Sequence, residues 1–245
     1  MSKRNVLALI GEDAPYTVID ALKQKGFEVF SLKRDPRLPL PVSSHADMLI
    51  FCAGDKIFMT EEYALSSQKL ISLLEGYGYN IILSSSVPDN VYPKDILFNM
   101  APLGKRVIGN IPFCDTTVTD HLMDNGYEFY TVKQGYTKCS TAIVGDNAII
   151  TADMTIAKIA ASLGIDVLRV NSYREVKLDG YDYGFIGGAC GYYDNTLYFS
   201  GNIEAHPEYQ AISDFCKMHS TVLCSLSSEP LYDVGSIFFI KDLKG

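Results

Sequence analysis

The 245-residue sequence has no tryptophan, only four histidines and no CxxC pair among its six cysteines. No apolar run approaches the roughly 20 residues that a membrane-spanning helix needs, and the first residues carry too few apolar side chains for a secretory signal. Basic residues are also scarce, 21 against 29 acidic ones, which gives a formal net charge of −8. This balance argues against nucleic acid and against a membrane surface as partners. The expected setting is the cytoplasm, with reduced thiols.

Sequence motifs for metals and cofactors are missing as well. The histidines stand alone, and no pair of them has the spacing of a zinc site. Residues 11–15, GEDAP, offer one glycine where a dinucleotide-binding loop needs three. We therefore expect no metal and no cofactor. The scattered cysteines are expected to be mostly small buried side chains.

What the sequence does contain is one order of elements that recurs: strand, tight turn, strand, helix, strand. The predicted units span about 45–84, 92–132, 136–170 and 181–226. In each unit, turn-forming residues separate the first two strands, and an amphipathic helix precedes the third. The turn positions are spaced by 50, 41, 49 and 48 residues, a period typical of repeat architectures; they are Gly54, Gly104, Gly145, Asp194 and Asp242.

A fifth unit is predicted to be divided between the two ends of the chain. Residues 232–245 supply its first strand and stop where the hairpin turn belongs, and residues 5–32 supply the second strand, the helix and the third strand. Pairing the two parts would close a ring and leave no unpaired sheet edge. We therefore predict an α/β fold with a single domain over residues 1–245. Two α/β domains divided near residue 90 would explain the order of elements but not the truncated hairpin.

Five ββαβ units in a ring, with the last unit closed by the N-terminus, resemble the pentein fold. This five-bladed α/β propeller is the fold of the guanidino-group-modifying enzymes, which include arginine deiminase, dimethylarginine dimethylaminohydrolase, amidinotransferases and agmatine deiminase. The ribosome anti-association factor is a non-catalytic relative. The stretches KCSTAIV, GFIGGACG and LYDVGSIFF also resemble an uncharacterised bacterial family of this fold.

The resemblance implies a site on the ring axis. In the catalytic members a cysteine near the C-terminus attacks the guanidinium carbon, a histidine transfers protons, and carboxylates bind the cation. This sequence departs from that pattern at both catalytic positions, because Ser236–Phe238 stand where the cysteine is expected and Tyr181–Tyr183 where the histidine is expected. Serine without a base is a poor nucleophile and tyrosine is a weak acid near neutral pH. Ordinary thiol-based guanidine hydrolysis is therefore not expected, and whether the protein is an enzyme stays open.

The segments that lead into the first strand of each unit are expected to converge on the axis. Four of the five contain an aspartate and four a tyrosine, which would suit a pocket for a small polar or cationic ligand. Alternatively, these side chains only begin strands and bind loop amides. The candidate ligand-binding residues are Asp47, Asp95, Lys138, Cys139, Ser140, Asp182, Tyr183, Asp233 and Ser236.

Two cysteines are candidates for a relocated nucleophile. Cys139 adjoins Lys138, whose charge could lower the pKa of the thiol, although neighbours on a strand point to opposite faces. Cys190 lies within GGACG, where flexible backbone could approach a ligand closely. A buried structural role is the alternative for both thiols.

We predict from these patterns a protein that binds a small polar or guanidine-like cation in an axial pocket. Two alternatives remain open. The first is a guanidine or amidine hydrolase or transferase that uses Cys139 or Cys190, and the second is a non-catalytic protein-binding ring. The oligomeric state is not indicated by the sequence.

Overall fold

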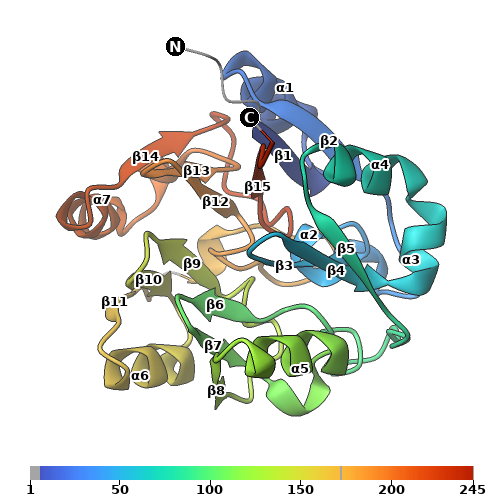
Figure 1. The fold of residues 1–245 in the computed structure, drawn as a ribbon. Coiled ribbons are helices and arrows are strands. Elements are labelled where there is room, and N and C mark those ends of the chain that lie inside the picture. The colour runs from blue at the N-terminus through green and yellow to red at the C-terminus, as the bar shows by residue number, and fades with distance from the viewer. Residues whose placement is uncertain (1–5, 172, 245) are drawn as a thin grey trace.

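Five sheets of three strands each are arranged round a common centre (Figure 1). The computed structural model describes residues 6–171 and 173–244. In every sheet, the middle strand pairs antiparallel with one neighbour and parallel with the other. A tight hairpin is sufficient for the antiparallel partner, whereas the parallel partner requires a crossover, which a helix provides. This is the predicted ββαβ connectivity.

Four of the sheets are formed by continuous stretches of chain. The first two units contain β3 (Phe51–Ala53), β4 (Lys56–Thr60), α3 (Glu61–Ser66), α4 (Gln68–Gly76) and β5 (Asn80–Ser84), then β6 (Ala101–Leu103), β7 (Arg106–Gly109), α5 (Thr116–Asp124) and β8 (Glu128–Thr131). The next two contain β9 (Thr141–Val144), β10 (Ala148–Thr151), α6 (Met154–Ser162) and β11 (Asp166–Arg169), then β12 (Cys190–Tyr193), β13 (Thr196–Phe199), α7 (Tyr209–Met218) and β14 (Val222–Ser225). Short helical turns precede the first strand of a unit or lie within one: η1 (Leu40–Val42), α2 (Ala46–Leu49) and η3 (Tyr173–Glu175) precede first strands, whereas η2 (Ile111–Phe113) and η4 (Ile203–Ala205) lie just before α5 and α7.

The fifth sheet joins the two ends of the chain. Strand β15 (Phe238–Lys241) pairs antiparallel with β1 (Val6–Gly11), and α1 (Tyr16–Gln24) carries the chain to β2 (Glu28–Leu32), which pairs parallel with β1. The predicted split unit is therefore present, except that residues 5 and 245 lie outside the described residues. The fold class predicted from the sequence, a pentein-type α/β propeller, is confirmed. Its organisation as a single domain stays a prediction.

Local sequence explains why each unit turns and restarts where it does. The hairpin residues Gly54, Gly104, Gly145 and Asp194 all have a positive φ, between 47° and 65°, which is the backbone conformation that tight hairpins require. Three of the helices, α3, α5 and α6, then begin at side-chain caps. Asp153 Oδ1, for example, accepts hydrogen bonds from the backbone N–H groups of Thr155 and Ile156, and this satisfies two donors that have no partner within the helix.

Five hydrophobic clusters lie between neighbouring units and hold the ring together. The cluster between the second and third units, for example, includes Leu103, Ile108 and Ile149. Burial of these side chains is the main favourable contribution to folding, about 1.5–3 kcal/mol for each large one. Among the described residues, no helix is both long and apolar enough to cross a membrane.

Two elements differ from the sequence-based prediction. The run ADMLIFC, residues 46–52, predicts one strand at the start of its unit, but Ala46–Leu49 form the single helical turn α2. All four of its side chains are buried, the polar Asp47 included, and a short, wholly buried run has no periodicity that separates strand from helix. The helix expected from Thr60 to Gly76 is interrupted at Ser67, whose φ and ψ of −123° and 36° are not helical.

Candidate functional site

The segments that precede the inner strands meet at the centre of the ring. Each unit contributes there: α2 carries Asp47, and the loops before β6, β9 and β15 carry Asn99, Cys139 and Ser236. The fourth unit contributes the carbonyl of Gly187, which lies 3.1 Å from Ser236 Oγ. All four side chains are buried. The site is therefore assembled from residues up to 189 positions apart in the sequence.

Asp47 is the centre of this network. Its Oδ2 accepts a hydrogen bond from Ser236 Oγ at 2.6 Å and one from Cys139 Sγ at 3.1 Å. Lys138 Nζ donates to Ser236 Oγ at 2.8 Å, so the ammonium group and the carboxylate lie on either side of one hydroxyl. An ionised group in the interior needs such hydrogen bonds and an opposite charge nearby. The two charges and the hydroxyl therefore stabilise one another.

Asn99 fixes the position of Cys139. Its side-chain oxygen accepts hydrogen bonds from the backbone N–H groups of Lys138 and Cys139, at 2.8 and 3.2 Å. Its side-chain nitrogen lies 3.1 Å from Cys139 Sγ and 3.3 Å from the backbone oxygen of Asp47. One buried amide thus holds both the thiol and the segment that carries the carboxylate. The strand-neighbour argument for separating Lys138 from Cys139 does not apply, because both precede β9.

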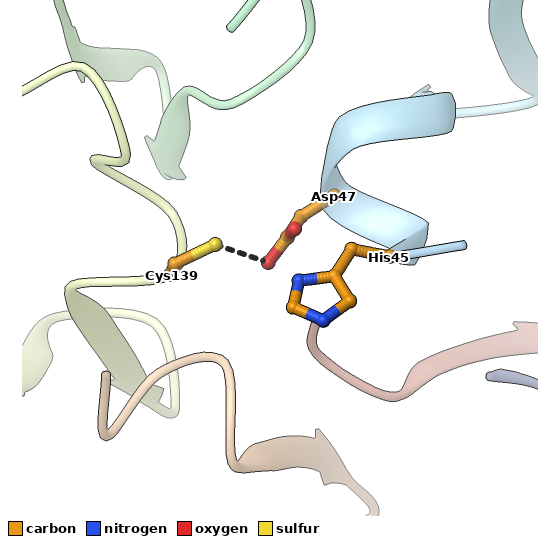
Figure 2. Close-up of side chains that lie close together, drawn as sticks. All are labelled: His45, Asp47 and Cys139. Carbon is orange, nitrogen blue, oxygen red and sulfur yellow. Dashed lines mark hydrogen bonds between the residues drawn. The ribbon is translucent and has the colours of Figure 1, made fainter. Parts of the chain in front are cut away.

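His45 lies beside this network, at the start of α2. Figure 2 shows one nitrogen of its ring turned toward the Asp47 carboxylate, with the sulfur of Cys139 beyond it. His45, Asp47 and Cys139 each offer one potential metal-ligand atom, and these three atoms lie within 4.8 Å of one another. On another side, His45 Nδ1 is 3.9 Å from Asp233 Oδ1, which is too far for a hydrogen bond.

Asp233 is a second buried carboxylate, held by backbone amides. Its Oδ2 accepts from the N–H of Phe185 at 2.8 Å, and its Oδ1 from the N–H of Gly235 at 3.0 Å. The backbone comes this close only because glycines are present: a Cβ on Gly188 would lie 2.0 Å from Asp233 Oδ1, and one on Gly235 2.1 Å from the Cβ of His45. The glycines near the axis are thus required by close packing around Asp233 and His45.

Burial shifts the ionisation of these groups away from the charged form. It raises the pKa of Asp233 to about 6, against the opposing effect of the hydrogen bonds from Phe185 and Gly235. It also lowers the pKa of His45, and with the nearby carboxylates of Asp47 and Asp233 it raises the pKa of Cys139 well above its ordinary value. Near neutral pH the thiol is therefore protonated and the imidazole neutral.

A pocket of about 220 Å³ opens onto this group. His45, Cys139 and Asp233 form part of its lining. Its walls include four aromatic side chains, and Asp182 adds an exposed second acid. The aromatic lining residues are Tyr136, Tyr181, Tyr183 and Phe185.

The remaining candidates from the sequence are placed less centrally. Asp95 lies behind the pocket wall, where its Oδ2 accepts from the Tyr136 hydroxyl at 2.5 Å, and burial raises its pKa. Ser140 lines a neighbouring cavity of about 180 Å³. Cys190 lines a third cavity, of about 260 Å³, between inner strands of the sheets. The structure thus brings together Asp47, Lys138, Cys139 and Ser236 by hydrogen bonds, with Asp182, Tyr183 and Asp233 at the adjoining pocket.

Sequence reasoning missed His45 and Asn99. His45 was set aside because no second histidine stands at metal-site spacing, yet its partners are an acid two residues away and a thiol 94 positions along the chain. The signal for His45 was its position inside a segment expected to reach the axis. Asn99 lies after residues 92–95, the segment of its unit that was expected to reach the axis, and carries no comparable signal.

Comparison with protein families and with solved structures agrees with this architecture. Residues 9–238 match the model of a family of unknown function, DUF6873. The chain belongs to that family. A search of curated proteins finds no match.

Among solved structures, dimethylarginine dimethylaminohydrolase from Pseudomonas aeruginosa in complex with citrulline is similar over 97% of this chain and 98% of its own, with 10% identity and a TM-score of 0.58. Agmatine deiminase from C. jejuni covers 92% of this chain and 88% of its own, with 9% identity and a TM-score of 0.55. An inosamine-phosphate amidinotransferase from Streptomyces griseus has 9% identity and a TM-score of 0.54 over 94% and 79%. At such low sequence identities, the structural similarity establishes the fold of this chain. The resemblance to guanidino-group-modifying enzymes is therefore confirmed for the fold.

Proposed function

We propose that this protein binds a small guanidine- or amidine-like cation in the pocket beside Asp233. The observation that carries the proposal is the chemistry of the pocket lining. Two carboxylates, those of Asp182 and Asp233, stand among four aromatic side chains, and no lysine or arginine is among the described residues that line it. A cation is attracted both by carboxylates and by the faces of aromatic rings.

Asp233 retains acceptor capacity for such a ligand. Each carboxylate oxygen has two lone pairs, and the backbone amides of Phe185 and Gly235 use one on each oxygen. A planar cation with N–H groups could occupy the remaining positions. Because the volume is about 220 Å³, the pocket suits a small metabolite rather than a peptide. Solved structures with this fold include proteins whose names specify arginine derivatives and agmatine, which is consistent with a ligand of this class.

A direct test measures binding of agmatine, arginine and dimethylarginine by calorimetry and by thermal shift. We expect at least one of them to bind, and Asp233→Asn to weaken binding by about tenfold or more, which corresponds to about 1.4 kcal/mol. Asp194→Asn is the matched control, because Asp194 is an exposed hairpin residue. If none of the three cations stabilises the protein, or if both variants bind equally well, the proposal is wrong.

A second candidate function, turnover of the bound cation, is favoured by the position of Cys139. Its sulfur lines the pocket and donates to Asp47 Oδ2 at 3.1 Å. A bound cation would favour the thiolate electrostatically. The thiol proton would pass to Asp47, the thiolate would attack the amidinium carbon, and the proton would return from Asp47 to the departing nitrogen, which leaves as ammonia. Water would then cleave the carbon–sulfur bond, so that an amidinium ion and water yield an amide and ammonium.

This second candidate is tested with chloroacetamidine, a cation that alkylates thiols with loss of chloride. We expect peptide mass spectrometry to find faster labelling at Cys139 than at Cys190. With the neutral analogue chloroacetamide, the ratio of the two labelling rates should be smaller. Both thiols are equally buried, at 2% exposure, so the neutral reagent controls for access. Equal labelling of the two cysteines by the cationic reagent would remove the argument for Cys139.

A further inference from the structure

Three potential metal ligands converge beneath the pocket. His45, Asp47 and Cys139 place one nitrogen, one oxygen and one sulfur within 4.8 Å of one another. Figure 2 shows that the three side chains approach a common point from two segments, His45 and Asp47 from the start of α2 and Cys139 from the loop before β9. Imidazole, carboxylate and thiolate are all ligands of zinc in proteins.

Two of these groups present polar atoms for which the described part of the chain supplies no hydrogen-bond partner. They are His45 Nδ1 and Asp47 Oδ1, on side chains that are 4% and 0% exposed. Leaving a buried polar atom unsatisfied costs about 1–3 kcal/mol. Two unpartnered atoms on adjacent ligand-type side chains indicate a position that a third species occupies.

We propose that His45, Asp47 and Cys139 bind a thiophilic divalent cation of the Zn²⁺ class, with a fourth coordination position open to the pocket. Asp47 Oδ1 and His45 Nδ1 would be the oxygen and nitrogen ligands. Cys139 would bind as the thiolate and release its proton to solvent. Two of the three ligands, His45 and Cys139, line the pocket, which provides the path by which the cation reaches the site.

The geometry requires little movement. In a tetrahedral site with Zn–S near 2.3 Å and Zn–N or Zn–O near 2.0–2.1 Å, neighbouring ligand atoms lie about 3.5 Å apart. Cys139 Sγ is already 3.1 Å from Oδ2 of the Asp47 carboxylate, and no two of the three ligand atoms are more than 4.8 Å apart. Shortening the longest separation from 4.8 Å to about 3.5 Å requires side-chain movements of about 1 Å.

Neighbouring groups are positioned to support the ligands. Ser236 Oγ donates to Asp47 Oδ2, which leaves Oδ1 directed away from that hydrogen bond, and Asn99 Nδ2 lies 3.1 Å from Cys139 Sγ. Hydrogen bonds of this kind orient metal ligands in proteins. Lys138 is hydrogen-bonded to Ser236 rather than to any of the three ligands, so its charge is one group removed from the metal position.

The metal and the proposed cationic ligand would exclude each other. A divalent ion at this position places positive charge at the base of the pocket and occupies the Cys139 sulfur. The metal-bound pocket would instead favour an anion or a neutral donor at the open position. This competition rests on the proposed function, whereas metal binding itself does not.

The test is titration of the purified, metal-stripped protein with ZnSO₄ by calorimetry and with CoCl₂ by absorbance. We expect one equivalent to bind, and the cobalt form to show a thiolate-to-metal charge-transfer band. Cys139→Ser and His45→Ala should each weaken zinc binding by more than about 100-fold. Loss of a residue that only hydrogen-bonds to a metal ligand weakens binding by about 10- to 100-fold. Cys190→Ser and His219→Ala, which alter a second buried thiol and a histidine outside the site, are the matched controls.

If a variant fails to fold, the absorbance spectrum of the cobalt-loaded wild-type protein still tests the proposal. A folded wild type that binds cobalt without a thiolate band, or that binds zinc no more tightly than Cys139→Ser, overturns the proposal. Agmatine added to the metal-free protein separates the two proposals, because the zinc-loaded protein is expected to exclude it. Zinc binding without any agmatine binding would contradict only the proposed function, and agmatine binding without zinc binding only the metal site.

Discussion

Two cysteines lie near the ring centre and are equally buried, yet their surroundings differ. Cys139 contacts Asp47 and Asn99 and faces the pocket of about 220 Å³. Cys190 faces a cavity of about 260 Å³ with largely apolar walls, and its hydrogen-bond acceptor is the backbone oxygen of Gly187 at 3.6 Å. Burial raises the pKa of Cys190 to about 12, and it also raises that of Cys139. Exposure and pKa direction therefore do not separate the two thiols, whereas the polar partners do.

Lys138 lies between the two cavities. It lines the apolar cavity, and its Nζ is 5.9 Å from the centre of the Phe238 ring. The same Nζ reaches Ser236 Oγ and, through it, Asp47. This one side chain supplies a positive charge to the acidic network while its stem contacts the apolar side. Lys138 thus connects the acidic network of Asp47 and Ser236 to the wall of the apolar cavity.

The largest expected effect is on stability when Asp47 is removed. Asp47→Ala should lower the free energy of unfolding by about 3–5 kcal/mol, because it leaves the Lys138 ammonium without its buried counter-charge. The measurement is chemical denaturation. Asp182→Ala, which removes an exposed acid from the rim of the same pocket, should change stability by about 0.5 kcal/mol or less. Equal effects would show that the buried network is no more important than the rim.

A second prediction concerns pH. The pKa of Asp233 is raised by burial to about 6, from an ordinary value of 3.8. The folded state therefore holds this proton more tightly than the unfolded state. The resulting stability is fully present below about pH 4 and is lost as pH rises to about 6, by on the order of 3 kcal/mol.

Asp233→Asn isolates this contribution from acids whose pKa is lowered, such as Asp13 and Asp55, since these change stability with pH in the opposite direction. Between pH 4 and 6, the free energy of unfolding of the wild type should therefore fall relative to that of Asp233→Asn. Denaturation curves collected across that range check the difference. Parallel pH profiles would show that Asp233 titrates normally in the folded state.

The smallest expected effect compares the same substitution at the two thiols. Cys190→Ser should cost about 1–3 kcal/mol, because a hydroxyl buried among apolar walls gains no strong partner. Cys139→Ser should cost less than about 1 kcal/mol, since the new hydroxyl can donate to Asp47 and accept from Asn99. Thermal and chemical denaturation measure both. A greater loss at Cys139 would reverse the distinction drawn between the two cavities.

Much of the fold could be predicted because each unit repeats its own local signals. Turn residues such as Gly54, Gly104 and Asp194 indicate hairpins from local sequence alone, and their spacing predicts five units. The split fifth sheet followed because β15 has no partner strand after it in the sequence. Prediction was wrong at Ala46–Leu49, where a wholly buried run that includes the polar Asp47 lacks the exposed positions that distinguish a helical from a strand period.

The candidate site could be predicted only as a set of segments. Asp47 and Cys139 both lay in segments expected at the axis, but nothing in the sequence indicates that their side chains meet. His45 was judged against other histidines, although its neighbours in space are an aspartate and a cysteine. Likewise, Ser236 was considered as a substitute nucleophile, whereas the structure places its hydroxyl between Lys138 and Asp47.

The sequence by itself determined the order of strands and helices, the five-unit period and the segments that approach the axis, because hydrophobic periodicity and turn chemistry act over a few residues. Only the tertiary structure decided which side chains share a hydrogen bond, which cavity each thiol faces and which acids lose contact with water. These properties depend on distances between residues far apart in the chain, and closing the ring sets all of those distances together.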